Sequence, residues 1–96
     1  MKFAIDDQAQ QEARDHVEWY AIRDKKAARR LAELFIATAE RIARNPLIFP
    51  LMEAPDNPGD VRRARLDDFP IIVIYQLLED EAFVVAVAHT SREPWY

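Results

Sequence analysis

The spacing of apolar and polar residues predicts a short strand followed by two helices. The string "KFAI" at residues 2–5 is short and apolar enough for a strand, and the aspartates after it, at positions 6 and 7, can cap a helix. Apolar residues then recur at helical spacing over residues 7–23, and again from Asp24, a second capping residue, to Asn45-Pro46. The two apolar stripes are Ala9, Ala13, Val17 and Tyr20, and then Leu31, Phe35, Thr38 and Ile42. The pattern therefore predicts a helical hairpin.

The second half of the chain predicts three strands, "VRRARL", "IIVIYQLL" and "AFVVAVAH". The connections "DDFP" and "EDE" are short, which favours an antiparallel meander. Before these strands, residues 45–60 predict a loop that ends in the turn-forming string "DNPGD". We expect an α+β fold, β-α-α-β-β-β, with the N-terminal helical hairpin packed on one face of a small, mostly antiparallel curved sheet. The length of 96 residues predicts a single domain over residues 1–96.

The composition excludes several kinds of site. The chain has no cysteine, which rules out disulfides and thiolate metal ligands, and its one glycine cannot build a glycine-rich phosphate loop. His16 and His89 are its two histidines, and neither lies in a metal-binding spacing. We therefore expect no metal and no cofactor. The N-terminus has no apolar signal core, and no run reaches the roughly 18 apolar residues that span a bilayer, so we expect a cytoplasmic protein without membrane contact.

Arginines are concentrated at the first strand of the meander, in a chain whose net charge is −4. Strand alternation places Arg63 and Arg65 on one face with Val61, and Arg62 on the other face with Ala64 and Leu66. Guanidinium groups on a strand can bind phosphates, or they can simply keep an edge strand soluble. His89 ends the last strand, where it can act as an acid or base or bond to a backbone carbonyl, and Arg92 follows it.

Aromatic residues occur in two adjacent pairs, and Trp19, Trp95 and Tyr96 are the aromatic candidates for contacts with a partner. Trp19 and Tyr20 are adjacent on the first helix and point about 100° apart, so we expect one in the core and one at its periphery. Trp95 and Tyr96 end the chain, where they can fold back as a lid or offer an aromatic surface to a partner.

Several strings in this order resemble one known family. They are "RRARLDDFP" at residues 62–70, which reads R-x-x-x-L-x-x-FP, the middle-strand Tyr75, and "AVAH-x-x-R-x-P" at residues 86–94. With the helical hairpin before them, they make nearly the whole chain similar to the RelE/ParE superfamily of toxins. These toxins come from bacterial type II toxin–antitoxin modules and are also called plasmid-stabilisation proteins.

The resemblance implies an antitoxin that wraps and neutralises the chain, and one of two targets. RelE-like members cut messenger RNA in the ribosomal A site with basic residues and a terminal aromatic, and Arg63, Arg65, Arg92 and Tyr96 match that set. ParE-like members poison DNA gyrase. The RelE-like nucleases carry an arginine near the start of the middle strand, where this chain has Ile71, Ile72 and Val73. The "FP" string and His89 are more similar to the ParE branch.

We therefore expect a ParE-like toxin that inhibits growth by binding DNA gyrase, without chemistry of its own. The alternative is a ribosome-dependent endoribonuclease that uses Arg63, Arg65, Arg92 and His89, and a third interpretation is an inactive member kept for antitoxin or promoter regulation. For every interpretation we predict antitoxin binding in an apolar groove over the hairpin and sheet. The predicted contact residues are Trp19, Leu34, Ile36, Trp95 and Tyr96, in a homodimer or a heterotetramer with the antitoxin.

Overall fold

The computed structural model describes residues 2–52 and 59–90 of the chain. A strand and two helices precede three further strands, in the order β1-α1-α2-β2-β3-β4. The bounds are Lys2–Ile5 for β1, Asp7–Arg23 for α1, Lys25–Arg44 for α2, Asp60–Arg65 for β2, Ile71–Leu77 for β3 and Glu81–His89 for β4. The predicted α+β fold and its element order are confirmed, and α1 begins and ends where the sequence pattern predicted.

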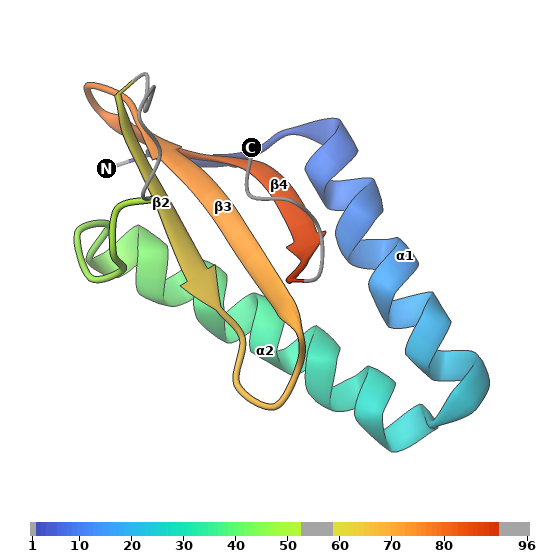
Figure 1. Cartoon of the computed structure of the whole chain (residues 1–96). Coiled ribbons are helices and arrows are strands. Elements are labelled where there is room, and N and C mark those ends of the chain that lie inside the picture. The colour runs from blue at the N-terminus through green and yellow to red at the C-terminus, as the bar shows by residue number, and fades with distance from the viewer. Residues whose placement is uncertain (1, 53–58, 91–96) are drawn as a thin grey trace.

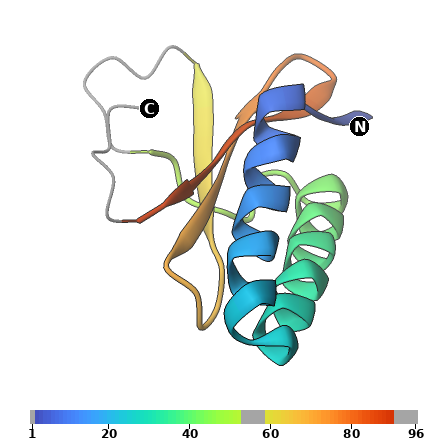
Figure 2. The same ribbon diagram turned by 90° about the vertical axis from the view of Figure 1, so that its right-hand side faces the viewer.

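The four strands form one sheet with the helices on a single side. The strand order is β1-β4-β3-β2, with β1 parallel to β4 and the other pairs antiparallel, so β2, β3 and β4 form the predicted meander. The helices lie side by side against the sheet in Figure 2, and β2 and β3 pass in front of α2 in Figure 1. One face of the sheet is thus covered by the hairpin, and Figure 1 looks onto the other face.

Aspartate caps define where both helices begin. The Asp6 carboxylate accepts a hydrogen bond from the Gln8 N–H at 3.0 Å. The Asp24 carboxylate accepts from the N–H groups of the second and third residues of α2, while the Asp24 N–H donates to the last turn of α1. A single residue therefore ends one helix and begins the next, which gives the hairpin its tight corner. Within the described residues, neither helix is long and apolar enough to cross a membrane.

A bulge in β4 lies beneath α1. Ile74 pairs with Ala86 but Tyr75 pairs with Val84, so Val85 has no opposite residue on β3. The parallel pairing with β1 also stops at Val84. Beyond that point α1 takes the place of a neighbouring strand at Val87, because its side chains bind both backbone groups of this residue. The Glu12 carboxylate accepts from the Val87 N–H at 2.9 Å, and the His16 ring nitrogen Nε2 lies 3.2 Å from the Val87 carbonyl oxygen.

Side chains alternate between two apolar clusters, one on each face of the sheet. The larger cluster packs beneath the helices and includes Leu31, Ile42, Ile71 and Tyr75, each at most 1% exposed. The smaller cluster lies on the opposite face and consists of Met52, Ile74, Ala86 and Ala88, with Val61, Ile72 and Val85 packed against it. The helical hairpin therefore covers one face of the sheet, and the side of β2 that bears Arg63 and Arg65 faces away from it.

Candidate functional site

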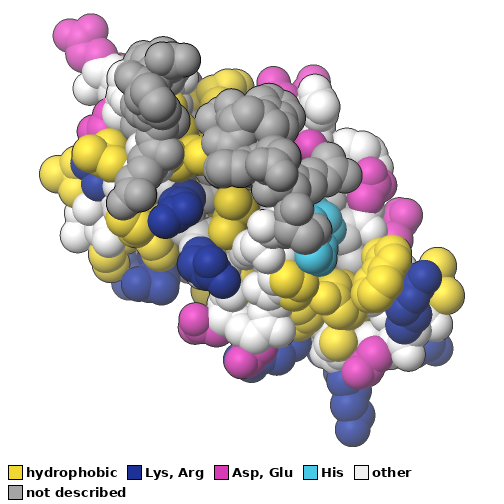
Figure 3. All heavy atoms as spheres, viewed as in Figure 1, with side chains coloured by type: hydrophobic (Ala, Val, Ile, Leu, Met, Phe, Trp, Pro, Cys, Tyr) yellow, Lys and Arg dark blue, Asp and Glu magenta, His cyan; other side chains and the backbone are white. Residues whose placement is uncertain are grey.

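Arg63 and Arg65 project from β2 onto the face of the sheet that the helices leave uncovered. They pair with Ile74 and Ile72 of β3, and side chains directly opposite each other share a face. Ile74 and Ile72 belong to the smaller apolar cluster, so the two guanidinium groups border an apolar floor. Figure 3 shows Lys or Arg side chains over β2 in this view. The register thus places Arg63 and Arg65 on one face of the sheet and Arg62 on the other, as strand alternation predicted.

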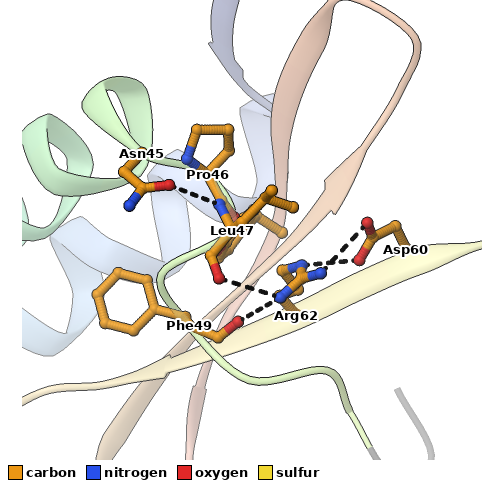
Figure 4. Close-up of polar contacts among 7 residues, drawn as sticks. Asn45, Pro46, Leu47, Phe49, Asp60 and Arg62 are labelled. Atoms are coloured by element: carbon orange, nitrogen blue, oxygen red, sulfur yellow. Dashed lines mark hydrogen bonds and ion pairs between the residues drawn. The ribbon is translucent and has the colours of Figure 1, made fainter.

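Arg62 has a structural role that the sequence did not reveal. Its side chain is 14% exposed and pairs with Asp60 at 2.7 Å. The same guanidinium donates to the carbonyl oxygens of Leu47 and Phe49, at 3.3 Å and 2.7 Å. Figure 4 shows these contacts of Arg62, which connect β2 to the segment that follows α2. Backbone bonds from Arg63 N–H to the Pro50 carbonyl and from Met52 N–H to the Val61 carbonyl hold the same segment against β2.

Tyr75, the middle-strand tyrosine, is part of the same support. It is fully buried, and its hydroxyl donates a 2.7 Å hydrogen bond to the Pro46 carbonyl oxygen. Its ring meets the Phe49 ring edge-on at 6.3 Å between centroids. Burial raises the pKa of Tyr75, and the nearby Arg62 charge acts more weakly in the opposite direction. A buried, protonated hydroxyl bound to a backbone carbonyl holds the loop after α2 in place and is not placed to act on a substrate.

His89 lies on the other face of the sheet from Arg63 and Arg65. It pairs with Ile71, whose side chain is 1% exposed in the cluster beneath the helices. The structure therefore brings Arg63 and Arg65 together but does not bring His89 to them. The other predicted nuclease residue, Arg92, and the predicted contact residues Trp95 and Tyr96 lie outside the described residues. In residues 2–52 and 59–90, no group of three or more His, Asp or Glu side chains could hold a metal ion.

An apolar groove of about 80 Å³ lies between the two helices and the sheet. Its lining comes from β1, α1, α2, β3 and β4, and consists of Phe3, Ile5, Ala9, Gln10, Ala13, Phe35, Thr38, Ala39, Ile42, Val73, Val84 and Val87. Small residues on the facing sides of the helices leave this space, and Ile5 at its β1 side is 41% exposed. The alanines at helical spacing in the sequence are the signal that could have located it.

The predicted contact residues of the helices do not line this groove. Trp19 lies near the end of α1 and is 52% exposed, whereas the groove involves the first half of α1. Leu34 is half-buried on α2, and its neighbour Ile36 is 63% exposed. An apolar groove over the hairpin and sheet is therefore present, with a different set of side chains from the one that the sequence suggested.

A helical hairpin on one face of a small, mostly antiparallel sheet is a fold found among toxins of bacterial toxin–antitoxin systems. The chain is similar to a solved structure titled "Chromosomal ParDE TA system from P. aeruginosa", with a TM-score of 0.76 over 93% of this chain and 95% of that chain. The two sequences are 12% identical, so this similarity concerns the fold. No curated protein matches the chain.

The family itself is identified from the sequence profile of the "ParE toxin of type II toxin-antitoxin system, parDE", which matches residues 3–94. The chain belongs to this family. The resemblance to the RelE/ParE superfamily that the motifs indicated is thereby confirmed.

Proposed function

We propose that this chain is the toxin of a type II toxin–antitoxin pair, that it arrests growth by binding DNA gyrase, and that it performs no chemistry of its own. Membership of the ParE toxin family supports the toxin role. The choice of gyrase as target follows the similarity of "FP" at residues 69–70 and of His89 to the ParE branch. A cognate antitoxin neutralises the toxin in the cytoplasm.

The observation that favours binding over cleavage is the separation of the candidate nuclease residues. An enzyme that cleaves RNA must bring its proton-transfer group and its cations to the same phosphodiester. Arg63 and Arg65 lie on the uncovered face, and His89 lies on the helix-covered face. The middle-strand Tyr75 is buried and bonded to a carbonyl. This arrangement supports a protein that acts through its surface.

The apolar groove is the proposed seat of the antitoxin. Its walls are rigid, because two helices and the central strands supply them, and its β1 side is open to solvent at Ile5. An apolar side chain that enters the groove is removed from water, which contributes about 25 cal/mol for each Å² of apolar surface buried. An extended or helical antitoxin segment with apolar anchors therefore fits it.

The test is controlled expression of the chain in bacteria, with and without the neighbouring antitoxin gene, combined with sequencing of RNA 5′ ends. We expect growth arrest and filamentation with intact messages, relief by the antitoxin, and inhibition of gyrase supercoiling by the purified protein. The double variant Arg63→Ala/Arg65→Ala serves as a comparison, because it removes the cations of the uncovered face and leaves the core unchanged. New in-frame cuts in translated messages that disappear in this variant would establish the endoribonuclease instead. Absence of arrest would identify an inactive toxin.

A further inference from the structure

The corner of the hairpin carries an apolar pair that the fold does not bury. Ile22, in the last turn of α1, is 83% exposed, the highest value among the large hydrophobic residues that the structure describes. Trp19, one turn earlier, is 52% exposed. Neither residue lines the apolar groove. Two large apolar side chains one helical turn apart make a contiguous exposed patch, and such patches mark interaction surfaces more often than single exposed residues do.

Stacked side chains hold Trp19 in place without covering it. The Arg23 guanidinium lies 3.8 Å from the centroid of the Trp19 ring, and the same guanidinium donates to the Trp19 carbonyl oxygen at 2.7 Å. The Tyr20 ring meets Trp19 edge-on at 4.9 Å and meets Phe69 at 5.1 Å. A pre-ordered tryptophan beside an arginine loses little conformational entropy when a partner binds, and these two residue types dominate binding hot spots.

Positive charge is concentrated beside this pair. Residues 23–30, "RDKKAARR", hold five basic and one acidic side chain in a chain whose net charge is −4. The single acid, Asp24, is occupied as the cap of α2. Arg30 pairs with Asp68 at 2.9 Å, whereas Lys25, Lys26 and Arg29 are exposed and form no ion pair with another described residue. Figure 3 shows hydrophobic side chains and Lys or Arg side chains together at the corner between α1 and α2.

We propose that this corner surface, formed by Trp19, Ile22, Arg23, Lys25, Lys26 and Arg29, is a docking site for an acidic protein segment with an apolar anchor. The anchor packs on Ile22 and the open part of Trp19, and the acidic side chains of the segment face the basic residues at the start of α2. The surface lies at the opposite end of α1 from the groove, so it is a second interface that is separate from the proposed seat of the antitoxin.

The charges around the apolar pair favour a protein over nucleic acid or a lipid surface. Asp15 and Glu18 are exposed and lie four residues before Trp19 and Ile22, so each apolar side chain has a carboxylate one turn away. A base stacked on Trp19, or a headgroup beside Ile22, would bring a phosphate towards these carboxylates, and like charges repel. A protein segment can place its acids only on the basic side of the patch.

The test measures binding of a fluorescein-labelled synthetic peptide, in which Asp and Glu surround a central Phe and Leu, to the full chain by fluorescence anisotropy. Three comparison probes are the same peptide with Ser in place of Phe and Leu, a labelled poly-dT oligonucleotide, and vesicles of phosphatidylglycerol. We expect the chain to bind the first peptide, with an affinity that falls as salt is added, and to bind the Ser peptide about tenfold more weakly.

Variants of the chain test whether the peptide binds at the corner surface. Ile22→Ser should weaken peptide binding about tenfold. The double variant Lys25→Glu/Lys26→Glu should abolish its salt dependence while α2 remains folded, because acids are favourable in the first turn of a helix. Ile36→Ser, which removes an exposed isoleucine of α2 that lies outside the corner surface, should leave the affinity unchanged. Absence of peptide binding, equal binding of the Ser peptide, tighter binding of the oligonucleotide or vesicles, or an unaffected Ile22→Ser variant would each overturn the proposal. None of these readouts depends on gyrase or on the antitoxin.

Discussion

The buried hydroxyl of Tyr75 should contribute to the stability of the fold, and this contribution should depend on pH. Tyr75→Phe removes the hydrogen bond to the Pro46 carbonyl, and we expect this to lower the free energy of unfolding by about 1 kcal/mol at neutral pH. Burial raises the pKa of Tyr75 above the ordinary value of 10.0, so the unfolded chain releases this proton first. The stabilising contribution of the hydroxyl is therefore complete below pH 10 and is lost as the pH rises through the raised pKa.

Urea denaturation of the wild type and Tyr75→Phe over a series of pH values tests this prediction. The difference between their free energies of unfolding should be constant up to about pH 10 and should narrow above it. A difference that stays constant in the alkaline range would mean that Tyr75 titrates at the same pH in the folded and unfolded chain.

Arg62 and Arg65 of β2 should respond differently to truncation. Arg62→Ala removes bonds from a charged donor to Asp60 and to two carbonyl oxygens, and we expect a loss of about 2–3 kcal/mol in the free energy of unfolding. Arg65→Ala, three strand positions further and exposed, should change the free energy of unfolding by less than about 0.5 kcal/mol. Chemical denaturation of both variants measures the contrast. Equal losses would show that Arg62 does not hold the segment after α2.

Strand alternation in "VRRARL" is sufficient to place Arg63 and Arg65 on one face and Arg62 on the other. It does not identify the partners of Arg62, because those are carbonyl groups 13 and 15 residues earlier, in a segment without any periodic pattern. The sequence likewise indicates a histidine at the end of the last strand. Only the pairing of His89 with Ile71 gives the face of the sheet that it occupies.

Helix α1 fixes its position over the sheet through Val87 of β4. The bulge at Val85 and the early end of β1 leave the Val87 backbone facing the helix, where Glu12 accepts its N–H and His16 binds its carbonyl oxygen. Glu12→Ala should lower the free energy of unfolding by about 1–3 kcal/mol, because it leaves a part-buried N–H without an acceptor. Glu12→Gln keeps an oxygen at the same position and should lose much less.

Hydrogen exchange at the Val87 amide provides the measurement for this element. The amide should exchange faster in Glu12→Ala than in Glu12→Gln, by more than the change in global stability accounts for. Equal exchange in the two variants would mean that the contact with α1 does not protect this amide.

At the scale of the whole molecule, local sequence patterns predict the order of the elements, whereas the groove is formed by pairings between residues far apart in the sequence. Helical periodicity and the aspartate caps located both helices, and short connections between apolar strings indicated the meander. The parallel pairing of β1 with β4, which joins Lys2 to Glu81, has no local signature. This pairing places Phe3 and Ile5 beside the helices. An apolar groove over the hairpin and sheet could therefore be predicted from the sequence, but the residues that line it could not.

The groove connects β1, both helices and the central strands, so a single charge within it should separate toxicity from neutralisation. Ile5 lines the groove and is 41% exposed, which lets a glutamate at this position reach water in the free toxin. Once an apolar antitoxin side chain covers it, the carboxylate must lose that water at a considerable cost in free energy. Ile5→Glu should therefore still arrest growth but should bind the antitoxin at least tenfold more weakly, whereas Ile36→Glu, outside the groove and 63% exposed, should behave as the wild type. Titration of each purified toxin with the antitoxin, read beside growth rescue in cells, measures both effects. Full rescue of Ile5→Glu by the antitoxin would place the antitoxin on another surface of the toxin. A variant that lost its toxicity as well as its binding of the antitoxin would show that the groove is part of the toxic surface itself.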